Sequence, residues 1–542
     1  EANKLCGGLL NTSRFVGAIS LPGDGAIDAS NVCALLASAA RKHEATILEG
    51  VKVTDVTALA DGQKGFEIIT DQGSVSAQMV VNSSGQWARR LGQMTNVGIP
   101  LHSCEHYYAY TRPGSMSVPS TFPVVRDPDG WLYAREWSQG LLVGSFEPNP
   151  KPTFHNGIVP DKFEFSLLDN DWDHFLPYLE DACETFPKMG EAEIDLLNGP
   201  ESFTMDNSYM MGEAPGLKNY FVACGMNSSG IASAGGVGYH IGEWIAEGMP
   251  AKHVWNVDMR RVQKFQKNQQ YVHARAQESL GDHYRMIAPK RELSTARGIR
   301  RSPLFDSLQS QGAQFGQKAG WERPNFFCTS DDKPSDPFVG PGLQPETWGE
   351  AAWMGPAAEE HIACRTSAAV FDMSSFAKLL VVGENSTAVI SRLCGNEVRG
   401  RAGFATYTQM LNPRGGVEAD VTVREVSPGV WMIFTGTDKG VRDKAWIEAM
   451  SEGKGVHVLD VTSMYSVLAL MGPAAPQILA RASGGEDADA ADLLAGWKPN
   501  EAREIDVGFA RATAVRTSYV GEKAGWELHI EADVAQHVYQ SL

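Results

Sequence analysis

The chain has 542 residues and a formal net charge of −18 at pH 7, and 43% of its residues are hydrophobic and 21% charged. This length predicts more than one sizeable core, and the composition is that of a globular protein, which excludes a disordered or fibrous chain. Because duplex nucleic acid is bound through clustered Lys and Arg, the acidic balance predicts no nucleic-acid partner. No apolar run approaches the roughly 20 residues that cross a bilayer, so we expect no membrane insertion.

The eight cysteines are scattered, and none forms a CxxC or Cys/His cluster with the spacing of a metal site. We therefore predict buried free thiols, a reducing compartment and no metal centre. The first residue is Glu, and the residues after it form no signal peptide or Arg-rich presequence. We interpret both ends of the chain as truncated.

The N-terminal part predicts an α/β arrangement. A turn at residues 21–25 precedes a helix that Asp28 or Ser30 can cap. The apolar face of this helix comprises Val32, Leu35, Leu36, Ala39 and Ala40. Strands are predicted around residues 45–57, 66–70 and 78–82. The last strand runs into the small residues of NSSGQWA and a further helix, which predicts a ligand crevice at the carboxyl end of a sheet. An ordinary strand-to-helix loop has the same pattern.

The next part of the chain predicts antiparallel strands. Residues 106–112, 131–136 and 141–146 have strand patterns, and the turn at Gln139 and Gly140 joins the last two. Such a sheet would form a separate layer that faces the substrate. A helix is predicted at residues 171–185.

The stretch NYFVACGMNSSGIASAGGVGYHIGEWI, residues 219–245, is the centre of the first half. Residues 220–224 predict a strand, a loop of small residues follows, and the apolar spacing from Gly238 predicts an amphipathic helix. Backbone N–H groups at such a helix start can hold electron-rich ligand atoms, and small residues admit a flat ligand. We therefore predict a cofactor loop. The alternative is a close-packed structural turn, because the glycine spacing is not that of the dinucleotide fingerprint.

The middle of the chain is polar and mixed. A basic patch at residues 285–301 is either a solvated face or a docking surface. Residues 330–345 are rich in Asp, Pro and Gly and predict a linker. We expect three domains, which span residues 1–255, 256–337 and 338–542.

Several motifs occur in an order that resembles one family. They are LPGDGAID, VVNSSGQWA, IPLHSCEHYY, DGWLYARE, GSFEPNPKP, MGEAP and the stretch at residues 219–245. Together they resemble the FAD-dependent amine oxidoreductases of the group formed by dimethylglycine dehydrogenase, sarcosine dehydrogenase and the pyruvate dehydrogenase phosphatase regulatory subunit, the last being most similar. The resemblance implies a multidomain α/β and α+β fold. Its first part would be an incomplete FAD-binding domain of the DAO, glutathione-reductase-like type, with an antiparallel substrate sheet.

The resemblance also implies which residues hold the flavin. On the adenine and pyrophosphate side they are Val53, Gly85, Gln86 and Trp87. Along the isoalloxazine they are Gly225, Ser229, Gly230 and Ile231.

His106 and Tyr133 match the family's substrate-side His and Tyr. Removing a hydride from an N-methyl carbon requires a neutral amine nitrogen, and a neutral imidazole can hold that deprotonated state. Tyr133 can orient the amine or the substrate carboxylate. Apart from the resemblance, a satisfied strand histidine between aromatic neighbours is the simpler interpretation of His106.

The second half, from AVFDMSSFAK through YTQMLNPRGGVEAD, resembles the aminomethyltransferase folate domain of the glycine cleavage system. Asp420 matches the acidic residue at the folate site, where a carboxylate can assist proton transfer. As a bare pattern, it is a turn residue at the start of a strand. Tyr407, Tyr519 and Glu527 match further folate-side positions. The family's YTGExGWEL reads YVGEKAGWE here, with Val in place of Thr and one extra residue.

Two functions follow from the resemblance. In the first, FAD oxidises a small N-methylated amino acid of the dimethylglycine or sarcosine type, tetrahydrofolate captures the released carbon, and an electron-transfer flavoprotein reoxidises the flavin. In the second, the chain is a non-catalytic regulatory subunit that binds the catalytic subunit of pyruvate dehydrogenase phosphatase. Both imply the mitochondrial matrix.

Overall fold

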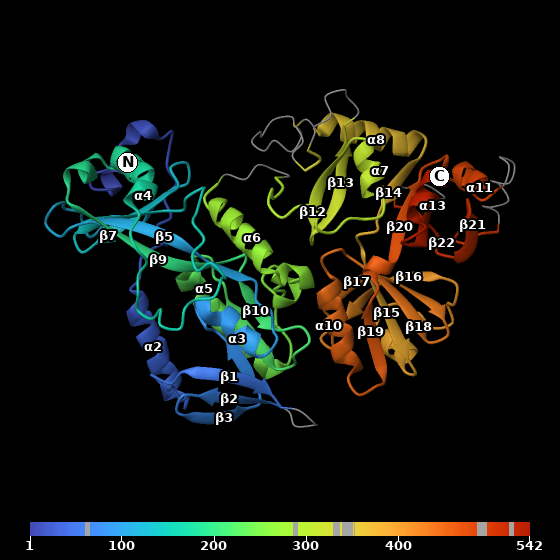
Figure 1. Ribbon diagram of the computed structural model, residues 1–542, viewed down its shortest axis with the longest axis horizontal. Helices are drawn as coiled ribbons and strands as arrows, with labels where there is room; N and C mark the ends of the chain where they lie inside the picture. Colours follow the sequence, from blue (N-terminus) through green and yellow to red (C-terminus); the bar gives the residue numbers. More distant parts are fainter. Residues whose placement is uncertain are drawn as a thin grey trace. The chain divides into compact units, whose positions relative to one another are not determined.

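A computed structural model of the chain describes residues 1–59, 65–285, 291–328, 336–338, 351, 353–484, 496–519 and 525–542. It divides into two compact units, Glu1–Ile287 and Ala288–Leu542, which are blue to green and yellow to red in Figure 1. Each unit is described by itself. Most of the predicted linker lies outside the described residues, and the division into three domains stays a prediction.

Unit 1 contains a small mixed sheet that carries the predicted cofactor crevice. In the strand order β10-β11-β4, strand β4 (Val80–Asn82) runs parallel to β11 (Tyr220–Cys224), and β10 (Met210–Glu213) pairs with β11 in antiparallel sense. Asn82 lies opposite Val222, so the carboxyl ends of β4 and β11 are neighbours. The predicted strands that end at this crevice are therefore confirmed.

A second sheet of unit 1 is an antiparallel meander of β1 (Val53–Ala58), β2 (Phe66–Thr70) and β3 (Gly73–Ala77). Helix α3 (Ala88–Met94) lies against β1. Helix α2 (Ala29–Lys42) is capped by Asp28, as predicted, because its carboxylate accepts a hydrogen bond from the backbone of Asn31 at 2.8 Å. No residue of α2 is buried, and Leu35 of its apolar face is 70% exposed.

The predicted antiparallel sheet has five strands in the order β6-β7-β8-β5-β9. They are β5 (Leu101–Thr111), β6 (Val125–Asp127), β7 (Leu132–Trp137), β8 (Gly140–Ser145) and β9 (Ile194–Thr204). On one face, Tyr107, Leu132 and Val143 form a core with Phe175 of the predicted helix α4 (Trp172–Thr185). On the other face, helix α6 (Gln269–Gly281) lies against β5 and β9. The second face carries His106 and Tyr133, as described below.

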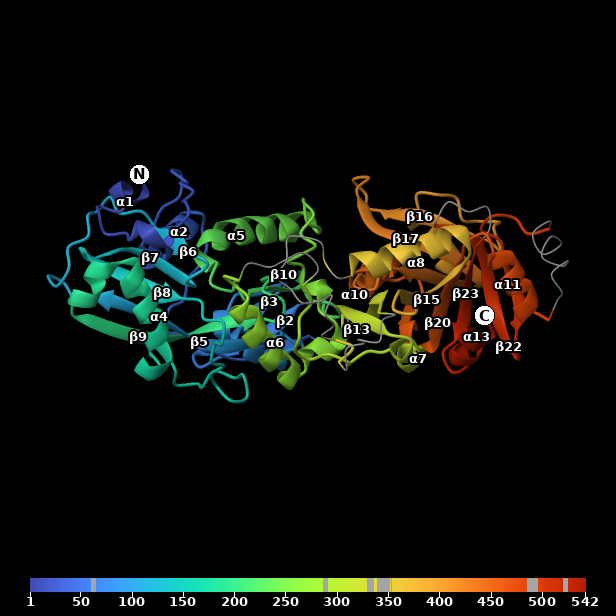
Figure 2. The same ribbon diagram turned by 90° about the horizontal axis from the view of Figure 1, so that it is seen from above.

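Helix α5 (Gly230–Glu247) follows β11 and begins at Gly230 rather than at the predicted Gly238. Its first turns consist of small residues with no apolar period, so the hydrophobic pattern marks only the later part of the helix. There Val237, Ile241 and Trp244 are buried. Figure 2 shows α5 lengthwise, above β10.

Unit 2 contains two five-stranded sheets and a hairpin. The first sheet has the order β14-β20-β23-β22-β21, with β14 (Ala369–Asp372), β20 (Tyr465–Met471), β21 (Ala502–Val507), β22 (Ala510–Thr517) and β23 (Gly525–Glu531). The second has the order β16-β17-β18-β15-β19, with β15 (Ala377–Gly383), β16 (Ala405–Leu411), β17 (Val417–Ser427), β18 (Val430–Thr435) and β19 (Val456–Asp460). The hairpin consists of β12 (Ala313–Lys318) and β13 (Trp321–Phe327).

The remaining helices lie around these sheets. In unit 1 they are α1 (Ala2–Leu5), η1 (Thr12–Arg14), η2 (Gly85–Trp87), η3 (Pro187–Glu191), η4 (Met259–Arg261) and η5 (Lys264–Lys267). In unit 2 they are α7 (Phe305–Ser310), α8 (Met354–Thr366), α9 (Ser386–Leu393), α10 (Gly440–Ser451), η6 (Thr462–Met464), α11 (Ala475–Ala482) and α13 (Ala535–Ser541). The main core of unit 2 joins α7 and α11 to Leu468, Trp526 and Leu528.

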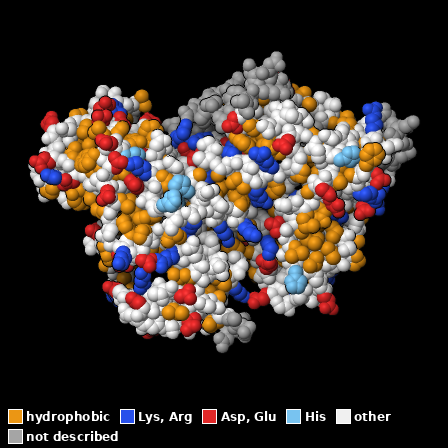
Figure 3. Space-filling view, viewed as in Figure 1, with side chains coloured by type: hydrophobic (Ala, Val, Ile, Leu, Met, Phe, Trp, Pro, Cys, Tyr) orange, Lys and Arg blue, Asp and Glu red, His pale blue; other side chains and the backbone are white. Residues whose placement is uncertain are grey.

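None of the eight cysteines forms a disulfide bond in the structure, and five of them are buried. Within the described ranges, no helix combines the length and the apolar character needed to span a bilayer. Acidic and basic side chains are interspersed over the face drawn in Figure 3, so the excess of Asp and Glu is not gathered into one field there.

Candidate functional site

Two loops of unit 1 meet where β4 and β11 end. The turn η2 follows β4 and lies against β11 and against the substrate-sheet strands β5 and β9. Gly85 in this turn has φ +55°, and Gly225 after β11 has φ +68°, a region that favours glycine. A Cβ atom on Gly225 would come within 2.7 Å of the side chains of Leu101 and Thr204. The loop after β11 can therefore approach the sheet this closely only with glycine at this position.

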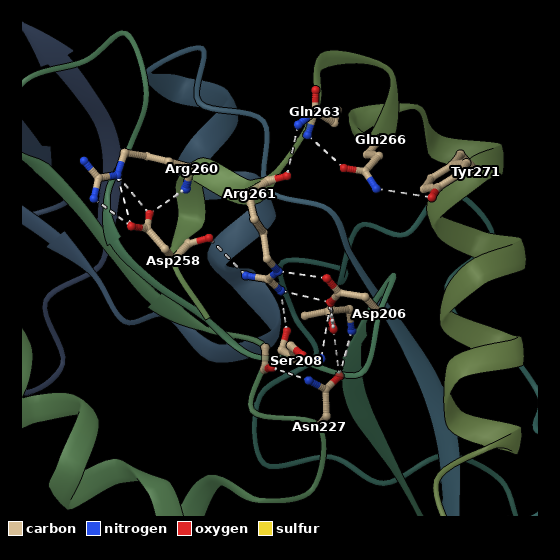
Figure 4. A network of polar contacts seen from close by, with 11 residues as sticks. Asp206, Ser208, Asn227, Asp258, Arg260, Arg261, Gln263, Gln266 and Tyr271 are labelled. Carbon is tan, nitrogen blue, oxygen red and sulfur yellow. Dashed lines mark hydrogen bonds and ion pairs between the residues drawn. The ribbon is translucent and has the colours of Figure 1, made fainter. Parts of the chain in front are cut away.

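A network of polar contacts holds the loop after β11 in place (Figure 4). Asn227 is 3% exposed and has φ +47°. Its Oδ1 accepts a hydrogen bond from the backbone N–H of Thr204 at 2.8 Å, and its Nδ2 donates to the carbonyl of Gly225 at 2.7 Å. Asp206, just beyond β9, forms an ion pair with Arg261 at 2.8 Å. Because these groups satisfy one another, they favour one conformation of the loop.

The loop leads into the N-terminus of α5, where several predicted cofactor residues lie. No side chain caps the helix at Ser229, so the backbone N–H groups of Gly230 and Ile231 are free to meet electron-rich ligand atoms. Ile231 is 61% exposed. In the turn η2, the Oε1 atom of Gln86 is buried and has no hydrogen-bond partner in the part of the chain that the structure describes.

These features fit a bound FAD. The uncapped helix start and the unsatisfied amide oxygen are polar groups that a ligand would complete. Trp87, in the same turn, is partly exposed, and Val53 is the first residue of β1, the strand on which α3 lies. The structure thus brings the η2 turn and the loop after β11 together, while Val53 lies in a separate sheet.

His106 and Tyr133 lie together on one face of the substrate sheet. The Nε2 atom of His106 is 2.9 Å from the Tyr133 hydroxyl, and the two rings are nearly parallel, with centroids 5.9 Å apart. Phe146 lies against both rings. Burial raises the pKa of Tyr133, and the charge of Glu201 raises it further, so the phenol stays protonated. Tyr133 occupies the space above Gly144, where an added Cβ would lie 2.1 Å from its Cζ.

Sequence reasoning missed three residues around this pair. Glu201 of β9 accepts a hydrogen bond from the hydroxyl of Ser228 in the loop after β11. The ring of His283 lies 4.4 Å from that of Phe146, and burial lowers its pKa. The pairing of β9 with β5 brings Glu201 close to His106 and Tyr133, and no local sequence pattern predicts that pairing.

In unit 2, two of the predicted folate residues lie on neighbouring strands. Asp420 of β17 accepts a hydrogen bond from Gln409 of β16 at 3.1 Å. Tyr407 of β16 is 59% exposed, and its hydrogen bond with Asp420 raises its pKa. Asp420 lies within β17, so the alternative interpretation as a turn residue is wrong.

The other two predicted folate residues belong to the other sheet and the segment next to it: Glu527 lies in β23, and Tyr519 lies two residues after β22. Tyr519 donates a hydrogen bond to Glu527 at 2.5 Å, and the second carboxylate oxygen of Glu527 is 3.2 Å from His529 Nε2. Burial acts to raise the pKa of Glu527, but hydrogen bonds from His529 and Tyr519 outweigh it, and the pKa is lowered. Sequence reasoning missed His529, although Glu527 and His529 are two residues apart on β23 and therefore share one face of the sheet.

The two folate pairs are not joined by a hydrogen bond or an ion pair among the residues described. The divergent residues 520–524 of the YVGEKAGWE motif lie outside those residues. A search of the described ranges finds no group of three or more His, Cys, Asp or Glu side chains that could hold a metal ion.

Comparison with known families assigns both units. Residues 1–244 match the family described as FAD dependent oxidoreductase, and residues 247–302 match the FAD dependent oxidoreductase central domain. Residues 304–542 match the GCVT N-terminal domain.

Curated relatives match the chain across both units. The pyruvate dehydrogenase phosphatase regulatory subunit of Mus musculus is 33% identical over 98% of this chain and 60% of its own length. The 4-methylaminobutanoate oxidase (formaldehyde-forming) of Paenarthrobacter nicotinovorans is 33% identical over 98% of this chain and 63% of its own length. The mitochondrial dimethylglycine dehydrogenase of Mus musculus is 32% identical over 98% of this chain and 60% of its own length.

The chain thus spans about three fifths of the length of these relatives. The resemblance inferred from the motifs is confirmed. The chain therefore combines an FAD dependent oxidoreductase domain and its central domain with a GCVT N-terminal domain, and it is similar over 98% of its length to dimethylglycine dehydrogenase, sarcosine dehydrogenase and the pyruvate dehydrogenase phosphatase regulatory subunit.

Proposed function

We propose that the protein is a flavoprotein that oxidises N-methylated amino acids of the dimethylglycine or sarcosine type. The observation that carries this proposal is the His106–Tyr133 pair, on a sheet whose strands β5 and β9 lie against the cofactor turn η2. When bound, FAD accepts a hydride from an N-methyl carbon. The residues that would hold it are Val53, Gly85, Gln86, Trp87, Gly225, Ser229, Gly230 and Ile231.

His106 and Tyr133 supply the proton chemistry in this proposal. The carbon loses a hydride only when the nitrogen lone pair is free, so the ammonium form of the substrate must first lose its proton. The imidazole of His106 can accept that proton or hold the neutral amine by a hydrogen bond. The Tyr133 hydroxyl is 2.9 Å from Nε2 of His106, and because the phenol stays protonated it can donate a hydrogen bond to that nitrogen and orient the ring.

For the second unit, we propose that Tyr407, Asp420, Tyr519 and Glu527 bind tetrahydrofolate, which captures the released one-carbon unit. The hydrogen-bonded pairs Tyr407–Asp420 and Tyr519–Glu527 support this assignment, because each presents a carboxylate to polar pterin atoms. An electron-transfer flavoprotein would reoxidise the flavin. Several relatives carry the word mitochondrial in their names, which supports a mitochondrial location, in the matrix.

A second candidate function is that of a non-catalytic regulatory subunit of pyruvate dehydrogenase phosphatase. One observation favours it: a relative that is 33% identical over 98% of this chain carries that name. In this case flavin would be a structural or sensing ligand, and the catalytic subunit of the phosphatase would be the partner.

Anaerobic mixing of the FAD-loaded full-length protein with dimethylglycine or sarcosine distinguishes the two functions. Bleaching of the flavin absorbance supports the dehydrogenase. The His106→Ala variant is expected to slow bleaching by at least ~10²-fold, because a positioned acid or base contributes that much. His155→Ala, at an exposed histidine, is the matched control and should bleach at the wild-type rate. An unchanged rate in His106→Ala removes His106 from the mechanism. Absence of bleaching, with co-purification of a phosphatase catalytic subunit, favours the regulator.

A further inference from the structure

Glu201 lies on the same face of the substrate sheet as His106. In the β5–β9 register, Glu201 is opposite Cys104, and His106 is opposite Gly199. Residues that lie opposite each other share a face, and so do residues two apart on one strand. Glu201 and His106 are therefore diagonal neighbours, a relation that places such residues roughly 7–8 Å apart. The carboxylate of Glu201 also acts on the pKa values of Tyr133 and His283, which places all four side chains around one point.

Among the described residues, the carboxylate of Glu201 has a neutral hydrogen-bond partner. The hydroxyl of Ser228, a residue held at φ +62° in the loop after β11, donates a hydrogen bond to it. No lysine or arginine forms an ion pair with Glu201 in the described part of the chain. The charge of Arg126 acts on nearby His283, but its guanidinium donates a hydrogen bond to the Tyr284 hydroxyl at 2.9 Å. The half-buried carboxylate of Glu201 therefore lacks a cationic partner among the described residues, and it attracts a cation that enters its surroundings.

The walls around the carboxylate suit an alkylated ammonium group. Phe146 and Tyr133 present aromatic rings, with centroids 5.6 Å apart. The ring of Tyr284 lies 4.6 Å from that of Phe146. Aromatic faces attract cations that carry methyl groups, because the ring quadrupole is negative and the methyl groups are poorly hydrated. Burial favours the neutral form of His283, so this ring adds no competing charge.

We propose that Glu201 binds the cationic nitrogen of the substrate and makes the site selective for ammonium ions over neutral molecules of the same shape. This inference rests on the proposed amine oxidation, since it names the group that receives the amine. With a neutral isostere the half-buried carboxylate keeps only the hydrogen bond from the Ser228 hydroxyl, whereas an ammonium ion adds an ion pair. The loss of a charged partner is discriminated against more strongly than a missing methyl group. Glu201 is thus a specificity-determining residue beside the His106–Tyr133 pair.

Binding of two matched probes tests the proposal without turnover. N,N,N-trimethylglycine and 3,3-dimethylbutanoate have the same shape and the same carboxylate and differ in a quaternary nitrogen against a carbon. Calorimetric titration of the FAD-loaded full-length protein gives the ratio of the two dissociation constants. We expect the wild type to bind trimethylglycine more tightly than 3,3-dimethylbutanoate. In Glu201→Gln, the ratio of the two dissociation constants should fall at least about tenfold. Glu105→Gln is the control, because Glu105 points to the other face, where it accepts a hydrogen bond from Asn198 at 3.0 Å.

The outcomes separate this proposal from the proposed function. If Glu201→Gln keeps the preference while dimethylglycine still bleaches the wild-type flavin, the role of Glu201 is refuted and the oxidase proposal stands. If the wild type shows a preference that Glu201→Gln abolishes but no amine bleaches the flavin, the cation site stands and the oxidase proposal fails. If the wild type binds both probes equally, or binds neither, the proposed role of Glu201 is refuted, whatever the variant shows. Should Glu201→Gln not fold, Glu201→Asp, which keeps the charge, must retain the preference.

Discussion

A methyl group placed on Gly144 tests the geometry of the amine site without removing any of its reactive groups. Gly144 lies opposite Tyr133 in the β7–β8 register, and a Cβ there would lie 2.1 Å from Cζ and 2.2 Å from the hydroxyl oxygen of Tyr133. Ordinary contacts begin at 3.4 Å, so the Tyr133 ring has to move. Overpacking of this kind costs about 1–3 kcal/mol, and loss of the hydrogen bond to His106 adds about 1 kcal/mol.

A double-mutant cycle measures this cost in urea unfolding. Gly144→Ala alone is expected to destabilise the protein by about 2–4 kcal/mol. In a Tyr133→Ala background the ring is absent, so the added methyl group should cost little, and the coupling energy should be at least about 1 kcal/mol. Tyr133→Phe keeps the ring and is the matched control, since the clash persists in it. Additive effects of Gly144→Ala and Tyr133→Ala would show that the Tyr133 ring does not cover Gly144.

Three further predictions concern the loop, the core of unit 2 and the folate residues. Asn227→Ala leaves the buried N–H of Thr204 unpaired. The variant should therefore bind FAD more weakly by about 1–3 kcal/mol, measured by calorimetry. An unchanged affinity for FAD would exclude a role for Asn227 in shaping the loop. Burial lowers the pKa of Lys378 to about 7 from 10.5 in the unfolded chain, so the unfolded state binds more protons between these values and stability rises with pH there. Lys378→Met should remove up to about 1.4 kcal/mol of this rise per pH unit, and parallel pH profiles of variant and wild type would contradict the assignment. Asp420→Asn should weaken tetrahydrofolate binding at least about tenfold while flavin bleaching stays normal, because the two sites lie in different units; equal folate affinity would remove Asp420 from the site.

Local patterns were sufficient for the framework of the site. The strand patterns of residues 131–136 and 141–146 and the turn at Gln139 and Gly140 predicted the β7–β8 hairpin, since strand propensity and turn chemistry act within a few residues. The small residues after β4 and β11 predicted both loops of the crevice for the same reason. His106 and Tyr133 were found through motifs, and the structure places them 2.9 Å apart.

The partners of these residues could not be predicted in the same way. Glu201 and Ser228 are brought together by strand pairing and by a left-handed loop conformation, and neither leaves a mark in the nearby sequence. The start of α5 was missed because its first turns lack apolar residues, and hydrophobic periodicity is silent there. His529 depends on a partner two positions away on the same strand, a signal that becomes readable only once the strand is known.

The hydrogen bonds from Thr204 to Asn227 and from Ser228 to Glu201 tie the end of β9 to the loop after β11 at two points. A ligand that orders this loop therefore also orders the strand end that carries Glu201, and the entropy lost on the first binding event is not lost again on the second. By linkage, bound flavin raises the affinity for the amine by the same factor as bound amine raises the affinity for flavin. Flavin and amine should accordingly bind with positive cooperativity, and this cooperativity requires no change of fold.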